Sequence, residues 1–161
     1  MKIMENWKEL SREYEIRFKG LENYRNKVWL VICRNFLQSY IDYRSSVLDI
    51  GSGYGEFIIN INASKKYAMD LNPQGEEILK KYGIVFVNQD CTKKWEFQDE
   101  QFDVIFSSNF LEHLKDKIQV EYIIEQSYRC LKKGGKIILL GPNIRYLADK
   151  YWDFWDHHIP I

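Results

Sequence analysis

The sequence predicts an α/β fold in which a doubly wound, mainly parallel sheet of five strands carries helices on both faces. Two observations lead to this prediction. After residue 46, short apolar runs alternate with stretches of helical character, which is the order that repeated strand–helix–strand units produce. The runs are apolar almost throughout, as expected for strands that are buried on both faces. The length of 161 residues fits one domain, so we treat residues 1–161 as a single unit.

Two helices are expected ahead of the sheet, over residues 5–19 and 22–41, with Gly20 between them. In the second helix, apolar side chains recur every four residues and define the face that would be buried. These side chains are Val28, Ile32, Phe36 and Tyr40, and the face is widened by Trp29, Val31 and Leu37. Residues 1–45 are therefore expected to form an N-terminal helical extension.

The core over residues 46–141 is expected to alternate strands and helices. The strands are expected at residues 47–50, 66–69, 84–87, 102–106 and 136–140. The helices between them are expected at residues 56–62, 73–81 and 116–132. Pro73 suits the first turn of its helix. Residues 91–101 are few and charged, so this crossover is expected to be an irregular loop.

The last of these helices has an expected apolar stripe and an expected stop. The stripe consists of Leu114, Ile118, Ile124, Tyr128 and Leu131. Gly134 and Gly135 come next, and glycine often ends a helix because it tolerates the left-handed backbone conformation. We therefore expect the helix to stop there and strand five to begin at Lys136.

Composition and charge argue against several classes of protein. The 23 basic and 23 acidic side chains balance, which disfavours binding to nucleic acid or to an anionic membrane surface. No apolar run is long enough to span a bilayer, and no secretory signal opens the chain. The three cysteines are widely spaced, which fits neither a disulfide framework nor a zinc site. A cytoplasmic protein without a nucleic-acid or membrane partner is expected.

A glycine-rich loop follows the first predicted strand directly. The loop reads Gly51-Ser52-Gly53-Tyr54-Gly55. Glycine lets the backbone pass close to a ligand, whose polar groups then meet the N–H groups at a helix start. The dinucleotide fingerprint needs its third glycine where this chain has Glu56, and a carboxylate there would repel a pyrophosphate. With Asp49 ahead of it, the loop suits a ligand that combines a carboxylate with positive charge.

Further polar positions follow strands two, three and four. Asp70 ends strand two, about twenty residues after the first glycine, where an acid can accept hydrogen bonds from both hydroxyls of a ribose. Asp90 follows strand three, and Ser107 and Asn109 follow strand four. The carboxyl ends of parallel strands meet at one edge of the sheet, where open α/β sheets bind ligands. We therefore expect these residues to share one site.

Five ordered segments resemble the motifs of class I S-adenosylmethionine-dependent methyltransferases, most closely their type 11-like small-molecule group. The segments are residues 47–55, 67–73, 89–90, 102–114 and 131–136. The resemblance covers residues 28–142 and implies a Rossmann-like sheet with the strand order 3-2-1-4-5. It also implies S-adenosylmethionine as the cofactor and methyl transfer to a small-molecule acceptor as the activity.

The resemblance implies a role for each matching residue. Asp49 and the glycine loop would face the methionine part of the cofactor, and Asp70 would hold its ribose. The adenine would lie against Leu71, with Asp90 at its amino group and Cys91 beside it. Ser107 and Asn109 would line the wall beside the sulfonium. The full expected set of cofactor-binding residues is Asp49, Gly51, Ser52, Gly53, Tyr54, Gly55, Asp70, Leu71, Asp90, Cys91, Ser107 and Asn109.

His113 is the one histidine next to the predicted site, and two interpretations of it stay open. It can serve as the general base that a hydroxyl acceptor needs, or it can pack and cap the start of a helix. An amine or thiol acceptor needs no such base, because the sulfonium methyl is already activated and orientation supplies most of the rate.

The aromatic-rich tail over residues 142–161 raises further expectations. In the family, two more strands form an antiparallel hairpin beside strand five, and too few residues remain here for that hairpin. The exposed edge would then be covered either by the tail or by a second copy of the chain, and the second alternative would give a homodimer through the strand-five edge or the tail. The tail rings can alternatively stack on the acceptor. The tail also holds four side chains of types that bind metals, but its adjacent histidines point in different directions, so no metal is expected. These four are Asp153, Asp156, His157 and His158.

Two rival functions stand beside methyl transfer. A non-catalytic module that only binds S-adenosylmethionine would account for the short acceptor side of the chain. A nicotinamide-dependent oxidoreductase would use a similar glycine loop, but Glu56 disfavours it.

Overall fold

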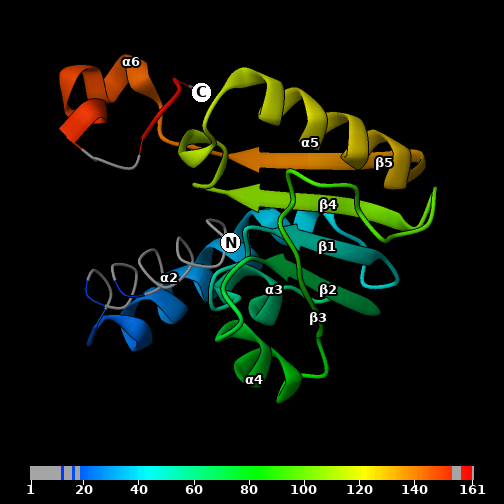
Figure 1. Ribbon diagram of the computed structural model, residues 1–161. Coiled ribbons are helices and arrows are strands. Elements are labelled where there is room, and N and C mark those ends of the chain that lie inside the picture. Colours follow the sequence, from blue (N-terminus) through cyan, green and yellow to red (C-terminus); the bar gives the residue numbers. More distant parts are fainter. Residues whose placement is uncertain (1–11, 13–15, 17–18, 154–156, 161) are drawn as a thin grey trace.

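A sheet of five parallel strands forms the centre of the molecule, in the order β3-β2-β1-β4-β5 (Figure 1). The computed structural model describes residues 12, 16, 19–153 and 157–160, and the predicted helix over residues 5–19 lies almost entirely outside this part. The strands are β1 (Ser46–Ile50), β2 (Lys65–Asp70), β3 (Val85–Asn88), β4 (Phe102–Ser108) and β5 (Leu131–Leu140). Their number, order and direction confirm the predicted fold.

Helices connect the strands and cover both faces of the sheet. The α-helices are α2 (Glu22–Asn35), α3 (Glu56–Asn60), α4 (Gly75–Lys80), α5 (Lys117–Cys130) and α6 (Ile144–Leu147). Three 3-10 segments join them, η1 (Leu37–Tyr40), η2 (Leu111–His113) and η3 (Ala148–Asp153). The predicted helix over residues 22–41 is thus divided into α2 and η1, and α3 and α4 are shorter than predicted.

Alternate residues of β1 show how the sheet divides the core. Val47 belongs to a cluster with buried side chains of α2, η1, α3 and α4. Leu48 and Ile50 belong to a second cluster with Ile123 and Cys130 of α5. Because both faces of β1 are covered, the strand is apolar almost without interruption.

The buried face of α5 differs from the predicted stripe. Ile123, Ser127 and Cys130 are buried, whereas Ile118 and Tyr128 are 75% and 83% exposed. The observed residues are spaced by three and four, so they have helical periodicity as well. The prediction was wrong because α5 carries apolar side chains on two sides, and only packing against the sheet selects one of them.

The predicted face of the N-terminal helical extension is confirmed in part. Leu37 is buried and Trp29 and Ile32 pack against the core, as predicted. Phe36 and Tyr40 are exposed, contrary to the prediction. The thiols of Cys33 and Cys130 are buried and behave as small apolar groups. Burial raises the pKa of each thiol.

The predicted glycine stop of α5 is also wrong. α5 ends at Cys130, and Leu131 already pairs with Phe102 as the first residue of β5. Gly134 and Gly135 lie inside β5, where the register with β4 shifts. Gly134 has φ +76°, and a side chain at Gly135 would press on two backbone carbonyls. Glycine therefore permits an irregularity within the strand rather than a helix cap.

The crossover over residues 91–101 contains no helix or strand, as predicted. Its Trp95 is buried and donates a hydrogen bond from Nε1 to the carbonyl of Cys91, 2.8 Å away. Arg129 of α5 donates to the carbonyl of Phe97 and to Asp99. These bonds fix a segment that has no regular backbone pairing of its own.

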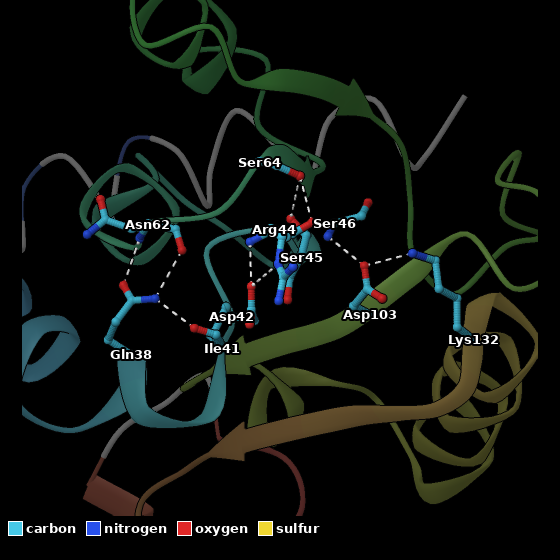
Figure 2. A network of polar contacts seen from close by, with 10 residues as sticks. All are labelled: Gln38, Ile41, Asp42, Arg44, Ser45, Ser46, Asn62, Ser64, Asp103 and Lys132. Atoms are coloured by element: carbon cyan, nitrogen blue, oxygen red, sulfur yellow. Dashed lines mark hydrogen bonds and ion pairs between the residues drawn. The ribbon is translucent and has the colours of Figure 1, made fainter.

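Polar side chains tie the strands together at their amino ends (Figure 2). Asp103 of β4 accepts hydrogen bonds from the N–H of Ser46 in β1 and from Nζ of Lys132 in β5, both at 2.8 Å. A cavity of about 200 Å³ lies beside Asp103 and Lys132. This cavity is at the opposite end of the strands from the glycine loop.

The tail turns back over the carboxyl ends of β4 and β5 (Figure 1). Within the described residues no strand follows Leu140, and His158 donates its backbone N–H to the carbonyl of Glu112 at 2.8 Å. Residues 154–156 lie outside the described part. None of the described helices combines the length and the apolar character needed to cross a bilayer.

Candidate functional site

The glycine loop has a backbone that few other residues could adopt. Gly51, Gly53 and Gly55 have φ values of +65°, +54° and +82°, in the left-handed region that disfavours side chains. The N–H of Gly51 donates to the carbonyl of Met69 in β2 at 2.9 Å. The loop is therefore fixed against β2 at the carboxyl end of β1.

Two of these glycines also lie against neighbouring side chains. A Cβ at Gly51 would collide with the ring of Phe110, which follows β4, and a Cβ at Gly55 would collide with Leu79 of α4. The loop thus occupies a narrow space between two elements. This close approach requires glycine independently of the backbone angles.

Asp70 connects the glycine loop to the loop that follows β2. Its Oδ2 accepts a hydrogen bond from the N–H of Gly53 and its Oδ1 from the N–H of Asn72, both at 2.8 Å. Burial raises the pKa of Asp70, and these two bonds and one from the N–H of Leu71 oppose the rise. The two carboxylate oxygens together have four lone pairs, so these three bonds leave one for a ligand.

Asp49 is a buried carboxyl on β1, directly before the loop, with 3% of its surface exposed. Burial raises the pKa of Asp49 well above its usual value, and the negative charges of Asp70 and Glu56 raise it further. A positively charged ligand beside these carboxylates would relieve their repulsion. The electrostatics of the loop therefore favour a cation.

Glu56 is less available to a ligand than its position in the sequence suggested. Its carboxylate accepts a hydrogen bond from Nε of Arg25 in α2 at 2.7 Å. Part of its charge is thus balanced within the protein. Glu56 would therefore repel a pyrophosphate less strongly than the sequence alone implied.

The residues after β3 divide between the site and the core. Asp90 uses Oδ1 to accept from the N–H and the hydroxyl of Thr92, which shapes the turn at the end of the strand. Cys91 is buried in the second core cluster, and burial raises the pKa of its thiol. Leu71 is half-buried, and its carbonyl accepts from Asn88.

Two buried oxygens in the loops of this site have no hydrogen-bond partner. Among the described residues, these orphaned side-chain atoms are Oγ of Ser52 and Oε1 of Gln89. Buried polar groups are normally paired, so both oxygens fit a polar ligand that enters between the loops after β1 and β3. Gln89 belongs to the matching segment 89–90, but the sequence reasoning gave the role at the adenine to its neighbour Asp90.

The predicted wall after β4 is formed differently at its two positions. Ser107 is buried and donates its hydroxyl to the carbonyl of Ile50 in β1 at 2.9 Å. Asn109 is exposed, has φ +47°, and donates its Nδ2 to Oγ of Ser108. Ser107 therefore joins two strands, and Asn109 is the more accessible of the two side chains.

The structure brings His113 beside a residue of the tail. The ring centroids of His113 and His157 are 5.2 Å apart. Glu112, adjacent to His113 on η2, is buried. Glu112 and His113 thus lie close to His157 in space. The sequence reasoning missed this group of three, because η2 and the tail are far apart in the chain and no local pattern links them.

Comparisons with known proteins agree on one family. A family model described as a methyltransferase domain matches residues 22–160. Phosphoethanolamine N-methyltransferase 3 of Arabidopsis thaliana is 39% identical over 59 residues, covering 37% of this chain and 11% of that protein. A demethylmenaquinone methyltransferase of Leptospira interrogans is 28% identical over 93% of this chain and 66% of its own length. The chain therefore spans less than two thirds of these curated relatives.

A solved structure shares the fold along nearly the whole chain. An S-adenosylmethionine-dependent methyltransferase from Archaeoglobus fulgidus aligns with a TM-score of 0.73 and 23% identity, covering 94% of this chain and 67% of that one. The likeness supports the same arrangement of sheet and helices.

Proposed function

Because the chain belongs to the methyltransferase-domain family, we propose that it transfers a methyl group from S-adenosylmethionine to a small-molecule acceptor. The family and the shared fold indicate S-adenosylmethionine as the cofactor. When bound, this cofactor supplies a methyl group that the positive charge on sulfur has already activated. The residues of the chain then have to bind the cofactor and the acceptor, orient them toward each other and exclude water.

The observation that carries the proposal is the bond between Gly53 and Asp70. It holds the left-handed glycine loop of β1 against the acid that ends β2. Asp70 keeps a lone pair for a ligand, which suits a hydroxyl of a ribose. The surrounding carboxylates favour the cationic amino and sulfonium groups of the cofactor over a pyrophosphate.

The orphaned oxygens fit the same ligand. Ser52 lies in the loop proposed to hold the amino-acid part, and its Oγ can accept from an ammonium group. Gln89 follows β3, and its Oε1 can accept from the amino group of adenine. Asp90 and Leu71 would complete the adenine end, while Cys91 would support it from the core.

A small-molecule acceptor is supported by the named substrates of two relatives, phosphoethanolamine and demethylmenaquinone. The carboxyl ends of β4 and β5 border a cavity of about 300 Å³, lined by Leu111, Glu112, Leu139, Leu140, Gly141, Pro142 and Asn143. Its volume is at the lower end of the range for small-molecule sites. We assign the acceptor to this side of the sheet.

His113 lies on η2, the element that borders this cavity. For a hydroxyl acceptor, it would take the proton as the methyl group is transferred. Replacing it by glutamine should then lower kcat and remove one limb of the pH profile, while leaving cofactor binding unchanged. An unchanged pH profile would exclude His113 as this base.

The proposal is tested by transfer of labelled methyl groups. The wild-type chain should label an acceptor from a panel that includes phosphoethanolamine, a demethylmenaquinone analogue and simple phenols. Asp70→Asn should lose at least about tenfold in cofactor affinity, because a charged acceptor of hydrogen bonds is worth about 1.5–3 kcal/mol. Asp42→Asn is the control, since within the described residues the Asp42 side chain bonds to Arg44 in its own exposed turn. Cofactor binding without transfer to any acceptor would instead support a non-catalytic module.

A further inference from the structure

Three side chains with metal-binding atoms meet where the tail packs against η2. One potential ligand atom from each of Glu112, His113 and His157 lies within 4.8 Å of the other two. Glu112 is 1% exposed, so its carboxylate is held in the protein interior rather than in water. We propose that Glu112, His113 and His157 form a binding site for a divalent transition-metal ion.

The hydrogen bond of His157 determines which ring nitrogen can bind a metal. Its Nδ1 lies 2.9 Å from the carbonyl oxygen of Tyr151. A carbonyl only accepts, so Nδ1 carries the proton, and the neutral ring has its lone pair on Nε2. Histidines that bind metals characteristically donate their other N–H to a backbone carbonyl or a carboxylate, which fixes the orientation of the ring.

The tail segment that carries His157 is anchored on both sides. Before it, Tyr151 is fully buried and donates its hydroxyl to the carbonyl of Ile159 at 2.6 Å. After it, the N–H of His158 donates to the carbonyl of Glu112 at 2.8 Å. The backbone of the first ligand thus holds the segment that supplies the third. Such positioning lowers the entropic cost of assembling a metal site.

The set of donor atoms selects the class of metal. Two imidazole nitrogens and one carboxylate oxygen suit Zn²⁺ and the neighbouring first-row ions, whereas Mg²⁺ and Ca²⁺ prefer oxygen throughout. Ligands of a tetrahedral zinc ion are about 3.3 Å apart, given bonds of about 2 Å. Small side-chain rotations would therefore close the observed group around an ion.

Three protein ligands leave at least one coordination position for water or another molecule. Glu112 also lines the cavity at the carboxyl ends of β4 and β5. With His113 as a ligand, the ion would take its place in activating a hydroxyl acceptor, by binding the acceptor oxygen and lowering its pKa. This last role rests on the proposed function, but binding of the metal does not. The proposal also replaces the earlier expectation of no metal, which considered the tail residues without η2.

The first experiment titrates ZnCl₂ into the full chain, without a histidine tag and after removal of metals by a chelator. Calorimetry should show one ion bound per chain for the wild type. His157→Ala should weaken binding at least tenfold, whereas His158→Ala should bind as the wild type does, because His158 is the exposed neighbour outside the group. No binding by the wild type, or unchanged binding by His157→Ala, would overturn the proposal.

The second experiment keeps a ligand at the same position. His157→Cys loaded with Co²⁺ should develop the near-ultraviolet band of a cobalt–thiolate bond, and His158→Cys should not. The natural cysteines are all buried, so the wild type provides the baseline. Absence of the band in a folded His157→Cys chain contradicts the site, even where His157→Ala does not fold. Neither experiment uses the cofactor, so failure of the metal site is distinguishable from failure of methyl transfer.

Discussion

At the residue scale, Gly51 combines a left-handed backbone with a close approach to Phe110. Gly83 has nearly the same φ, +67° against +65°, but a Cβ there would meet nothing within 4 Å. Gly83→Ala should cost about 1–2 kcal/mol from the backbone alone. Gly51→Ala should cost about 1–3 kcal/mol more, because the methyl group overpacks the loop.

Urea denaturation of the two variants measures this difference. Equal losses in the free energy of unfolding would show that Phe110 moves aside without cost. Binding of S-adenosylhomocysteine should weaken in Gly51→Ala alone.

Asp49 gives a prediction about pH. Because burial raises its pKa in the folded state, its charged form is unfavourable there, and its effect on stability worsens as pH rises through the folded-state pKa. Asp49→Asn should therefore stabilise the free chain at pH 7, by about 0.5–3 kcal/mol. The gain should shrink as pH falls below the usual pKa of an aspartate, where the acid is protonated in both states.

Asp103 supplies a control of opposite sign. Burial tends to raise the pKa of Asp103, but hydrogen bonds from Lys132 and Ser46 outweigh this and lower it. Asp103→Asn should thus destabilise the chain at pH 7, and this loss should fade as pH falls below the usual pKa of an aspartate. Denaturation curves of both variants at several pH values measure these changes in the free energy of unfolding. If Asp49→Asn and Asp103→Asn changed it in the same direction at pH 7, the opposite pKa shifts assigned to the two acids would be refuted.

The sequence located most of the candidate site because each motif is tied to the end of a strand. Asp70 and the three loop glycines lie where strand order and glycine spacing placed them. Ser107 and Cys91 were harder to judge, since a short polar residue at a strand end can turn to a neighbouring carbonyl or into the core. Only the packing of β4 and of the loop before Trp95 decides this.

At the scale of elements, α5 tests the observed buried face against the predicted stripe. Ile123 is 1% exposed and Ile118 is 75% exposed, so the two positions compare the same residue type in one helix. Ile123→Ala should lower the free energy of unfolding by about 2–5 kcal/mol. Ile118→Ala should change it by at most about 0.5 kcal/mol. Chemical denaturation would contradict the structure if the larger loss belonged to Ile118→Ala.

Strands were predicted more accurately than helix faces for a physical reason. A strand buried on both sides is a continuous apolar run, which β1 and β4 illustrate. A helix that carries apolar residues on several sides buries only one of them. Both α2 and α5 have apolar side chains on an exposed side as well as on the buried one, so the sequence alone does not identify the buried face. The glycine pair in β5 misled in a similar way, because glycine serves helix ends and strand irregularities equally well.

At the scale of the whole molecule, β5 forms an edge of the sheet. Lysines 132, 133 and 136 protect its first half by charge, but residues 137–140 are apolar. The described tail packs on η2, as the bond from His158 to Glu112 shows. We therefore expect this chain to self-associate through the second half of β5.

Light scattering after size-exclusion chromatography measures the molar mass of the chain at several concentrations and so tests for self-association through β5. Leu139→Lys should shift the chain toward monomer. Leu21→Lys should not, although Leu21 is similarly exposed, at 47% against 43%. A wild-type chain that stays monomeric at all concentrations would rule out this interface.

The contact between the tail and η2 belongs to this scale too. His113 and His157 lie close together because the tail that follows β5 packs against η2. No spacing in the sequence predicts this contact. Fold class and strand order follow from repeated local units, whereas such long-range side-chain groups depend on the completed tertiary structure.

The most direct test of the central claim is a calorimetric titration of the wild-type chain with S-adenosylhomocysteine and, separately, with NAD. The crevice formed by the glycine loop and Asp70 should bind one equivalent of S-adenosylhomocysteine and give no heat with NAD. Absence of heat with S-adenosylhomocysteine, or preferential binding of NAD, would contradict the account.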